Sequence, residues 1–89
     1  MIIKQGHWIY STKGGSYLTG KHVMTIMFNH YYKSPPNVHI SLVSLSAVSD
    51  EPCFHNRVQK VYNDKFELYI DICWRGMWNF GVEWTSIGY

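Results

Sequence analysis

The residues of this chain that are best suited to chemistry are two arginines and two tryptophans: Arg57, Trp74, Arg75 and Trp78. A guanidinium group holds several N–H donors in one plane, so it can bind neighbouring hydroxyl groups. An indole ring offers a rigid apolar surface that loses little conformational entropy on binding. The combination predicts a site for a polyol, whose hydroxyl edge would contact the arginines and whose C–H face would contact an indole.

Three of these residues also have a purely structural interpretation, and the sequence leaves both interpretations open. Trp74 and Trp78 are in phase with the apolar face of their predicted strands, so either ring could close the end of the core. Arg57 alone could be a solvated charge at a strand edge.

Other kinds of chemistry have less support in the sequence. The five histidines show no His-x-His pattern, and no Cys-x-x-Cys pair is present, so we expect neither a metal site nor a cofactor. Glu67 and Asp71 share one strand face but lie about 13 Å apart, which is too far for a glycosidase pair. Gly14-Gly15-Ser16 precedes a strand and not a helix, so it predicts no phosphate loop. We therefore expect that the chain is not an enzyme.

The two cysteines, Cys53 and Cys73, have no metal-ligand spacing. Cys53 lies just before one predicted strand and Cys73 at the end of the next, and those two ends are neighbours in an antiparallel pair. A disulfide and a pair of free thiols both remain open.

Composition bounds the class of protein. A chain of 89 residues is predicted to form one domain, 1–89, and 46% hydrophobic residues are too many for a disordered chain. No apolar run approaches the ~18 residues of a membrane span, so we expect no membrane insertion. Lys and Arg exceed Asp and Glu by only 8 to 6 and are scattered, which argues against nucleic acid as a partner. No signal peptide is recognisable; a mature secreted domain would look the same, so we expect an extracellular protein and leave a cytoplasmic one open.

Alternation of apolar and polar residues predicts strands along the whole chain. Phe66 to Trp74 alternates without a break, and Trp78, Phe80, Val82 and Trp84 continue the apolar face in a final strand. Further strands are predicted at 6–10, 24–28, 38–47 with a bulge near Leu42, and 58–62. Turn residues separate the strands at 14–16, 32–36, 49–52, 63–65 and 75–77. About six short antiparallel strands, each with one apolar face, predict an all-β sandwich of two packed sheets.

The order of signals along the chain resembles the H-type lectin domain family, the snail agglutinin and discoidin C-terminal type. The resemblance covers about residues 23–87. It depends on Phe28 ahead of Pro35-Pro36, the Arg57-Val58 pair, the strand that ends in Trp74, and the closing Glu83-Trp84-Thr85-Ser86-Ile87.

This resemblance implies a six-stranded antiparallel β-sandwich that assembles as a homotrimer or hexamer. It also implies sites between subunits for glycans with terminal galactose or N-acetylgalactosamine. The family's binding arginine falls on Arg57, its strand-end tryptophan on Trp74, and its nearby aromatic residue on Trp78. Arg75 stands where the snail type has a histidine, and the glycine of the first loop falls on Gly15.

The first loop departs from the snail type, because Ser16 and Tyr17 stand where that type supplies a carboxylate. A hydroxyl group replaces a charge-assisted hydrogen bond only weakly, so the sugar preference is expected to differ. The alternative function is a non-enzymatic module for protein interaction or oligomerisation, in which the same aromatic residues would cover a partner protein. Binding that free sugar inhibits would distinguish the two.

Overall fold

The structure is a computed structural model that describes residues 1–12, 16–47 and 53–89, without the side chains of Ala47, Trp74 and Arg75. These residues form five β-strands and no helix. The strands are β1 (Ile2–Ser11), β2 (Leu18–Met27), β3 (Asn37–Ala47), β4 (Cys53–Val61) and β5 (Lys65–Gly88).

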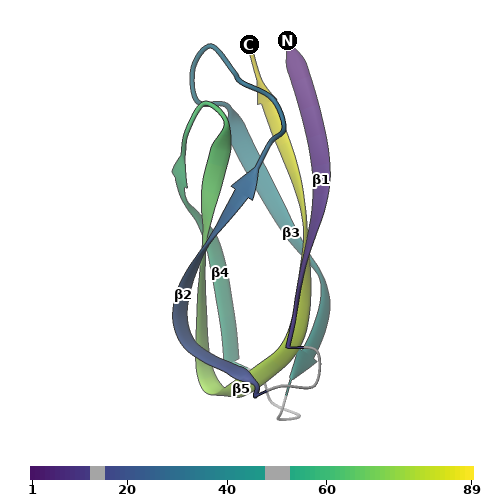
Figure 1. Ribbon diagram of the computed structural model, residues 1–89, viewed down its shortest axis with the longest axis vertical. Helices are drawn as coiled ribbons and strands as arrows, with labels where there is room; N and C mark the ends of the chain where they lie inside the picture. Colours follow the sequence, from purple (N-terminus) through teal and green to yellow (C-terminus); the bar gives the residue numbers. More distant parts are fainter. Residues whose placement is uncertain (13–15, 48–52) are drawn as a thin grey trace.

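Strand β5 is 24 residues long and is the only strand with which each of the other four pairs, always in antiparallel orientation. Its first half lies between β2 and β4, and its second half lies between β1 and β3. The strand therefore bends from one layer into the other, as Figure 1 shows, and is the central strand of both. The predicted antiparallel sandwich is confirmed, with two three-stranded layers that share one continuous strand.

The alternation in β5 explains how one strand can serve both layers. Phe66, Leu68, Ile70 and Ile72 are buried in the first half, and Phe80, Val82, Trp84 and Ser86 are buried in the second half. A strand that bends over its own inner face keeps that face on the inside of both layers. The even-numbered residues therefore line the core on both sides of the bend.

The turn predicted at 75–77 is wrong, because the backbone there stays extended within β5. Gly76 and Met77 are buried at the bend, and a side-chain carbon added to Gly76 would collide with the ring of Tyr17. Only glycine leaves room for this contact.

The inward position predicted for Trp78 is also wrong, since its side chain is 38% exposed. Strand β3 pairs with Asn79 and then with Met77, so Trp78 falls in an irregularity of the ladder. Met77 takes the interior position, and the indole is turned out of the core.

The strands that flank β5 are longer than the sequence predicts. Strand β2 begins at Leu18 and β4 at Cys53. The sequence did not indicate these early starts, because apolar residues are sparse in the first part of both strands and give only a weak alternating signal. The predicted bulge in β3 is confirmed by a register shift between Leu42 and Ser44.

Tyr32, in the connection from β2 to β3, ties the two layers together. Its ring is fully buried, and its hydroxyl lies 2.7 Å from Ser86 Oγ in β5. Its backbone N–H donates to Asn63 O at 2.8 Å, and its carbonyl oxygen accepts from Asn63 Nδ2 at 2.9 Å. The connection is thereby held to the second half of β5 and to the turn that precedes its first half.

Trp84 and Trp78 offer a test of which indole supports the fold. Trp84 is 6% exposed and packs against Phe28 and Phe66. We expect Trp84→Ala to lower the free energy of unfolding by about 3–5 kcal/mol through loss of a large buried ring. We expect Trp78→Ala to lower it by no more than about 1 kcal/mol. Urea denaturation of both variants measures the difference, and equal losses would contradict the assignment of the core.

Candidate functional site

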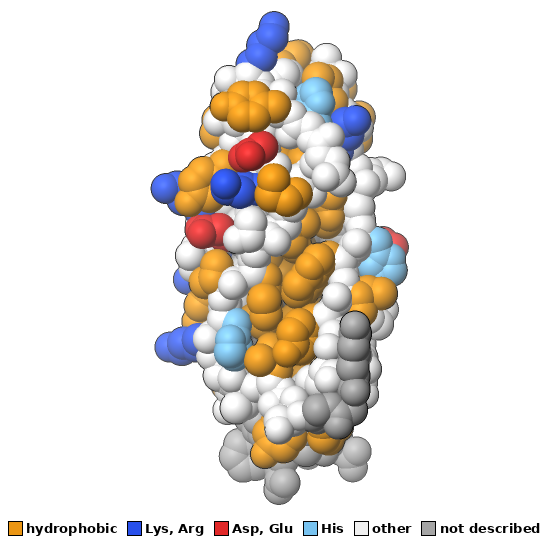
Figure 2. Space-filling view, viewed as in Figure 1, with side chains coloured by type: hydrophobic (Ala, Val, Ile, Leu, Met, Phe, Trp, Pro, Cys, Tyr) orange, Lys and Arg blue, Asp and Glu red, His pale blue; other side chains and the backbone are white. Residues whose placement is uncertain are grey.

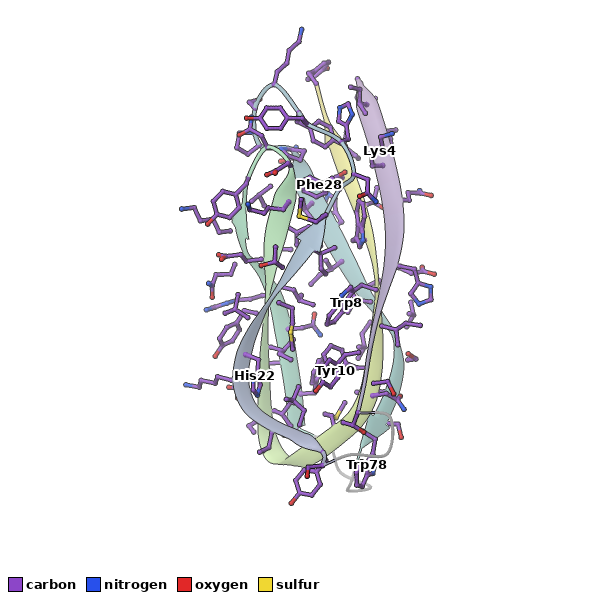
Figure 3. The ribbon with its side chains drawn as sticks, in the orientation of Figure 1. Lys4, Trp8, Tyr10, His22, Phe28 and Trp78 are labelled. Atoms are coloured by element: carbon purple, nitrogen blue, oxygen red, sulfur yellow. A yellow bond between two sulfur atoms is a disulfide. The ribbon has the colours of Figure 1, made fainter. Side chains whose placement is uncertain are left out.

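The bend of β5 and the segment before β2 meet at one end of the molecule. Tyr17 and Trp78 contact each other edge to face there, with ring centroids 5.6 Å apart and planes at 89°. Tyr17 is 46% exposed and Ser16 beside it is also exposed. Figure 3 places Trp78 at the end of the molecule opposite the two chain termini marked in Figure 1. Two of the predicted site residues, Tyr17 and Trp78, therefore form one exposed aromatic corner.

Three other predicted site residues lie partly or wholly outside the described part of the chain. Trp74 and Arg75 belong to β5 just before Gly76, so their backbone lies at the bend, and their side chains are outside the described part. Gly15 lies outside the described residues altogether.

Arg57 lies away from the aromatic corner. It is an exposed residue of β4, and its guanidinium carbon lies 4.5 Å from the centroid of the Tyr69 ring. Tyr69 is also its partner in the ladder, five residues before Trp74, which corresponds to about 17 Å along the strand. Among the described residues, no carboxylate pairs with Arg57, so stacking on Tyr69 orients the guanidinium and leaves its N–H groups unpaired.

The two cysteines form a disulfide, which resolves the alternative that the sequence leaves open. Cys53 is the first residue of β4 and Cys73 lies in β5, with their Cα atoms 5.2 Å apart. The bridge crosslinks β4 to β5 immediately before Trp74. His55, two residues along β4, has Nε2 3.7 Å from Cys53 Sγ. The sequence has no metal-ligand spacing that joins these three residues, because Cys73 is brought close to Cys53 and His55 only by strand pairing.

A depression lies between the edge strands β1 and β2, away from the aromatic corner. It has a volume of about 380 Å³ and is lined by residues of both strands, of β5 and of the connection after β2, including Gly6, Thr25, Phe28 and Trp84. Figure 2 shows apolar side chains along the hollow in this face. A side-chain carbon at Gly6 would collide with the Trp84 indole, so the ring can lie against β1 here only because residue 6 has no side chain. None of the predicted site residues lines it.

The comparisons leave the family unassigned. A scan against models of known protein families finds no match, and a search of curated proteins finds no similar sequence. No segment that the structure describes forms a helix of the length and apolarity that a membrane crossing requires.

The disulfide is expected to contribute to stability, because it closes a loop with a sequence separation of 20 residues. Replacing both cysteines, Cys53→Ser with Cys73→Ser, should lower the free energy of unfolding by about 3 kcal/mol, as expected for a loop of this length. Urea denaturation of the double variant measures the loss. An unchanged urea midpoint would contradict a stabilising crosslink. So would the detection of two reactive thiols when the wild-type chain is unfolded without a reductant.

Proposed function

We propose that this chain is a lectin domain that binds glycans with terminal galactose or N-acetylgalactosamine, at sites between the subunits of a homotrimer or hexamer. The observation that carries the proposal is the exposed aromatic corner of Tyr17 and Trp78 at the bend of β5. A monosaccharide has one apolar C–H face, and an exposed indole edged by a second ring is a suitable platform for it. The resemblance to H-type lectins points to Trp78 as well, whereas Tyr17 stands where the snail type supplies a carboxylate.

The position of Arg57 supports sites that two subunits share. Within one chain the ladder partner of this arginine, Tyr69, precedes Trp78 of the aromatic corner by nine residues of β5, or about 30 Å along the strand. A single sugar ring is too small to contact both. An arginine from one chain and an aromatic corner from its neighbour could enclose the ring together, as the resemblance implies.

The outer face of the β1–β5–β3 layer supports association of the chains. The side chains of Ile9 and Val43 lie on either side of Gly81. A Cβ atom added to Gly81 would be 3.6 Å from each of them. Both side chains are exposed, and the glycine between them keeps the surface flat. A domain of this size has a thin core, so burying such a patch against another copy adds to its stability.

The disulfide is in keeping with an extracellular location, because such bonds persist in oxidising compartments. The proposal also takes the protein to be a binding module and not an enzyme.

Arg57→Ala tests the sugar site. It should weaken binding of N-acetylgalactosamine about ten- to hundredfold, since a donor pair worth about 1.5–3 kcal/mol is lost. The melting temperature should hardly change, because an exposed arginine contributes little to folding. A matched control is Lys60→Ala, which removes another cation of β4 that lies over a tyrosine ring, 5.0 Å from the centroid of Tyr62. Calorimetric titration and thermal melting of both variants provide the measurements.

Two outcomes would count against this assignment. An Arg57→Ala protein that melts early and binds normally would show that the arginine is structural. A wild-type protein without sugar-inhibitable hits on a glycan array would favour the interaction module instead. Arg75→His would move that position toward the snail type, and on the same array it should change the sugar preference more than it weakens binding, because imidazole still offers a donor.

The assembly has its own prediction. Light scattering at micromolar concentration should report a trimer or a dimer of trimers, and Ile9→Glu should release monomers by placing a charge in the apolar patch. Met27→Glu is the matched control, because Met27 is equally an exposed apolar residue but belongs to β2 in the other layer. A monomeric wild-type protein would refute sites between subunits.

A further inference from the structure

Apart from the aromatic corner, a cluster of side chains that could bind a metal ion lies on the outer side of the β4–β5 pair. Its members are Cys53, His55 and Cys73, whose sulfur and ring nitrogen atoms all lie within 4.8 Å of one another. His55 and Cys73 are exposed, so an ion from solvent can reach the cluster. The binding site proposed above does not use these side chains as ligand contacts.

The sheet fixes the positions of these three side chains. Cys53 and His55 are two residues apart on β4, so they share one face of the strand. Cys73 is on the neighbouring strand β5, with its Cα 5.2 Å from that of Cys53. Two thiolates and one imidazole, held together by backbone pairing, make up a donor set that zinc prefers. Because the strands position the donors, little chain entropy is lost when an ion binds.

We propose that, once the disulfide is reduced, Cys53, His55 and Cys73 bind one Zn²⁺ ion, with water as the fourth ligand. The reductant is a dithiol. It gives two electrons and two protons to the Cys53–Cys73 bond, which becomes two thiols, and is itself oxidised to a disulfide. Zinc then binds the two sulfurs as thiolates, and the two thiol protons pass to solvent.

The charges around the cluster are compatible with a divalent cation. Two thiolates neutralise the ion, and neutral imidazole adds no charge. Asp71 is the ladder partner of His55 and adds a negative charge nearby. In the ladder with β2, Asp71 lies opposite Lys21, and the positive charge of the lysine offsets part of that negative charge. The two thiolates therefore supply most of the charge that a zinc ion requires. Because they form only when the disulfide is reduced, reduction controls whether the zinc site exists.

The consequence is a crosslink between β4 and β5 in either redox state. In an oxidising compartment the disulfide joins the strands. In a reducing compartment zinc joins the same two sulfurs and adds His55. The backbone immediately before the bend of β5 would then keep its place in both environments.

Zinc titration of the full chain, followed by competition with a coloured chelator, tests the proposal. Chain reduced with a phosphine and freed of metal should bind one zinc ion per chain, and the oxidised chain should bind none at the same concentration. Co²⁺ serves as a second probe, because its absorption reports thiolate ligands and tetrahedral geometry directly. Equal zinc binding by oxidised and reduced chain would overturn the proposal, as would the absence of stoichiometric binding by the reduced chain.

Two variants separate the cluster from other histidines. His55→Ala should weaken zinc binding to the reduced chain by at least about tenfold, equivalent to ~1.4 kcal/mol. His39→Ala, an exposed histidine of β3 in the other layer, should leave it unchanged. Equal affinities for the two variants would overturn the role of His55.

A thermal melt covers the case in which the reduced chain loses its fold. Zinc should raise the melting temperature of reduced wild-type chain, or restore its cooperative transition if reduction has abolished it. The same addition should have a smaller effect on His55→Ala. No effect of zinc on either chain would overturn the proposal.

Discussion

Every backbone ladder in the described sheet includes β5, and this dependence on one bent strand governs the structure. Because β1, β2, β3 and β4 each pair with it, the position of one layer relative to the other is set where β5 bends. At the bend Gly76 lies against the ring of Tyr17, and this close contact requires a residue without a side chain. Tyr32 supports the same arrangement from the other end, through its buried hydrogen bond to Ser86.

The bend also accounts for the position of the candidate site. It interrupts the ladder at Trp78, which turns the indole outward against Tyr17, so the exposed aromatic corner is a product of the geometry that joins the layers. The crosslink between Cys53 and Cys73 lies immediately before this bend. We infer that the disulfide, or zinc in its place, keeps the strand fixed where the proposed sugar site is built. Arg57 pairs with Tyr69 in the first half of β5, well before the bend, which explains its distance from the corner.

Alternation along β5 was sufficient to predict the fold class and most of the core. The inward faces of Phe66 to Ile72 and of Phe80 to Trp84 follow from a period of two residues. The bend could not be told from a turn, because Arg75-Gly76 suits either and the contact of Gly76 with Tyr17, a residue distant in the sequence, is not visible in the local pattern. The exposure of Trp78 follows from a register irregularity that periodicity does not contain. Similarly, the nearness of His55 to Cys73 arises only when β4 and β5 pair.

If Arg57 of one chain and the Tyr17–Trp78 corner of another form one site, as proposed, two variants that each lack one half of it will complement each other in mixed oligomers. Arg57→Ala and Trp78→Ala chains would be unfolded together, refolded as an equal mixture and titrated with N-acetylgalactosamine. Each variant alone should bind poorly, and the mixture should regain about one quarter of the sites, because adjacent chains combine at random in a cyclic oligomer. A mixture that binds no better than the separate variants, although the chains have exchanged, would contradict the shared site.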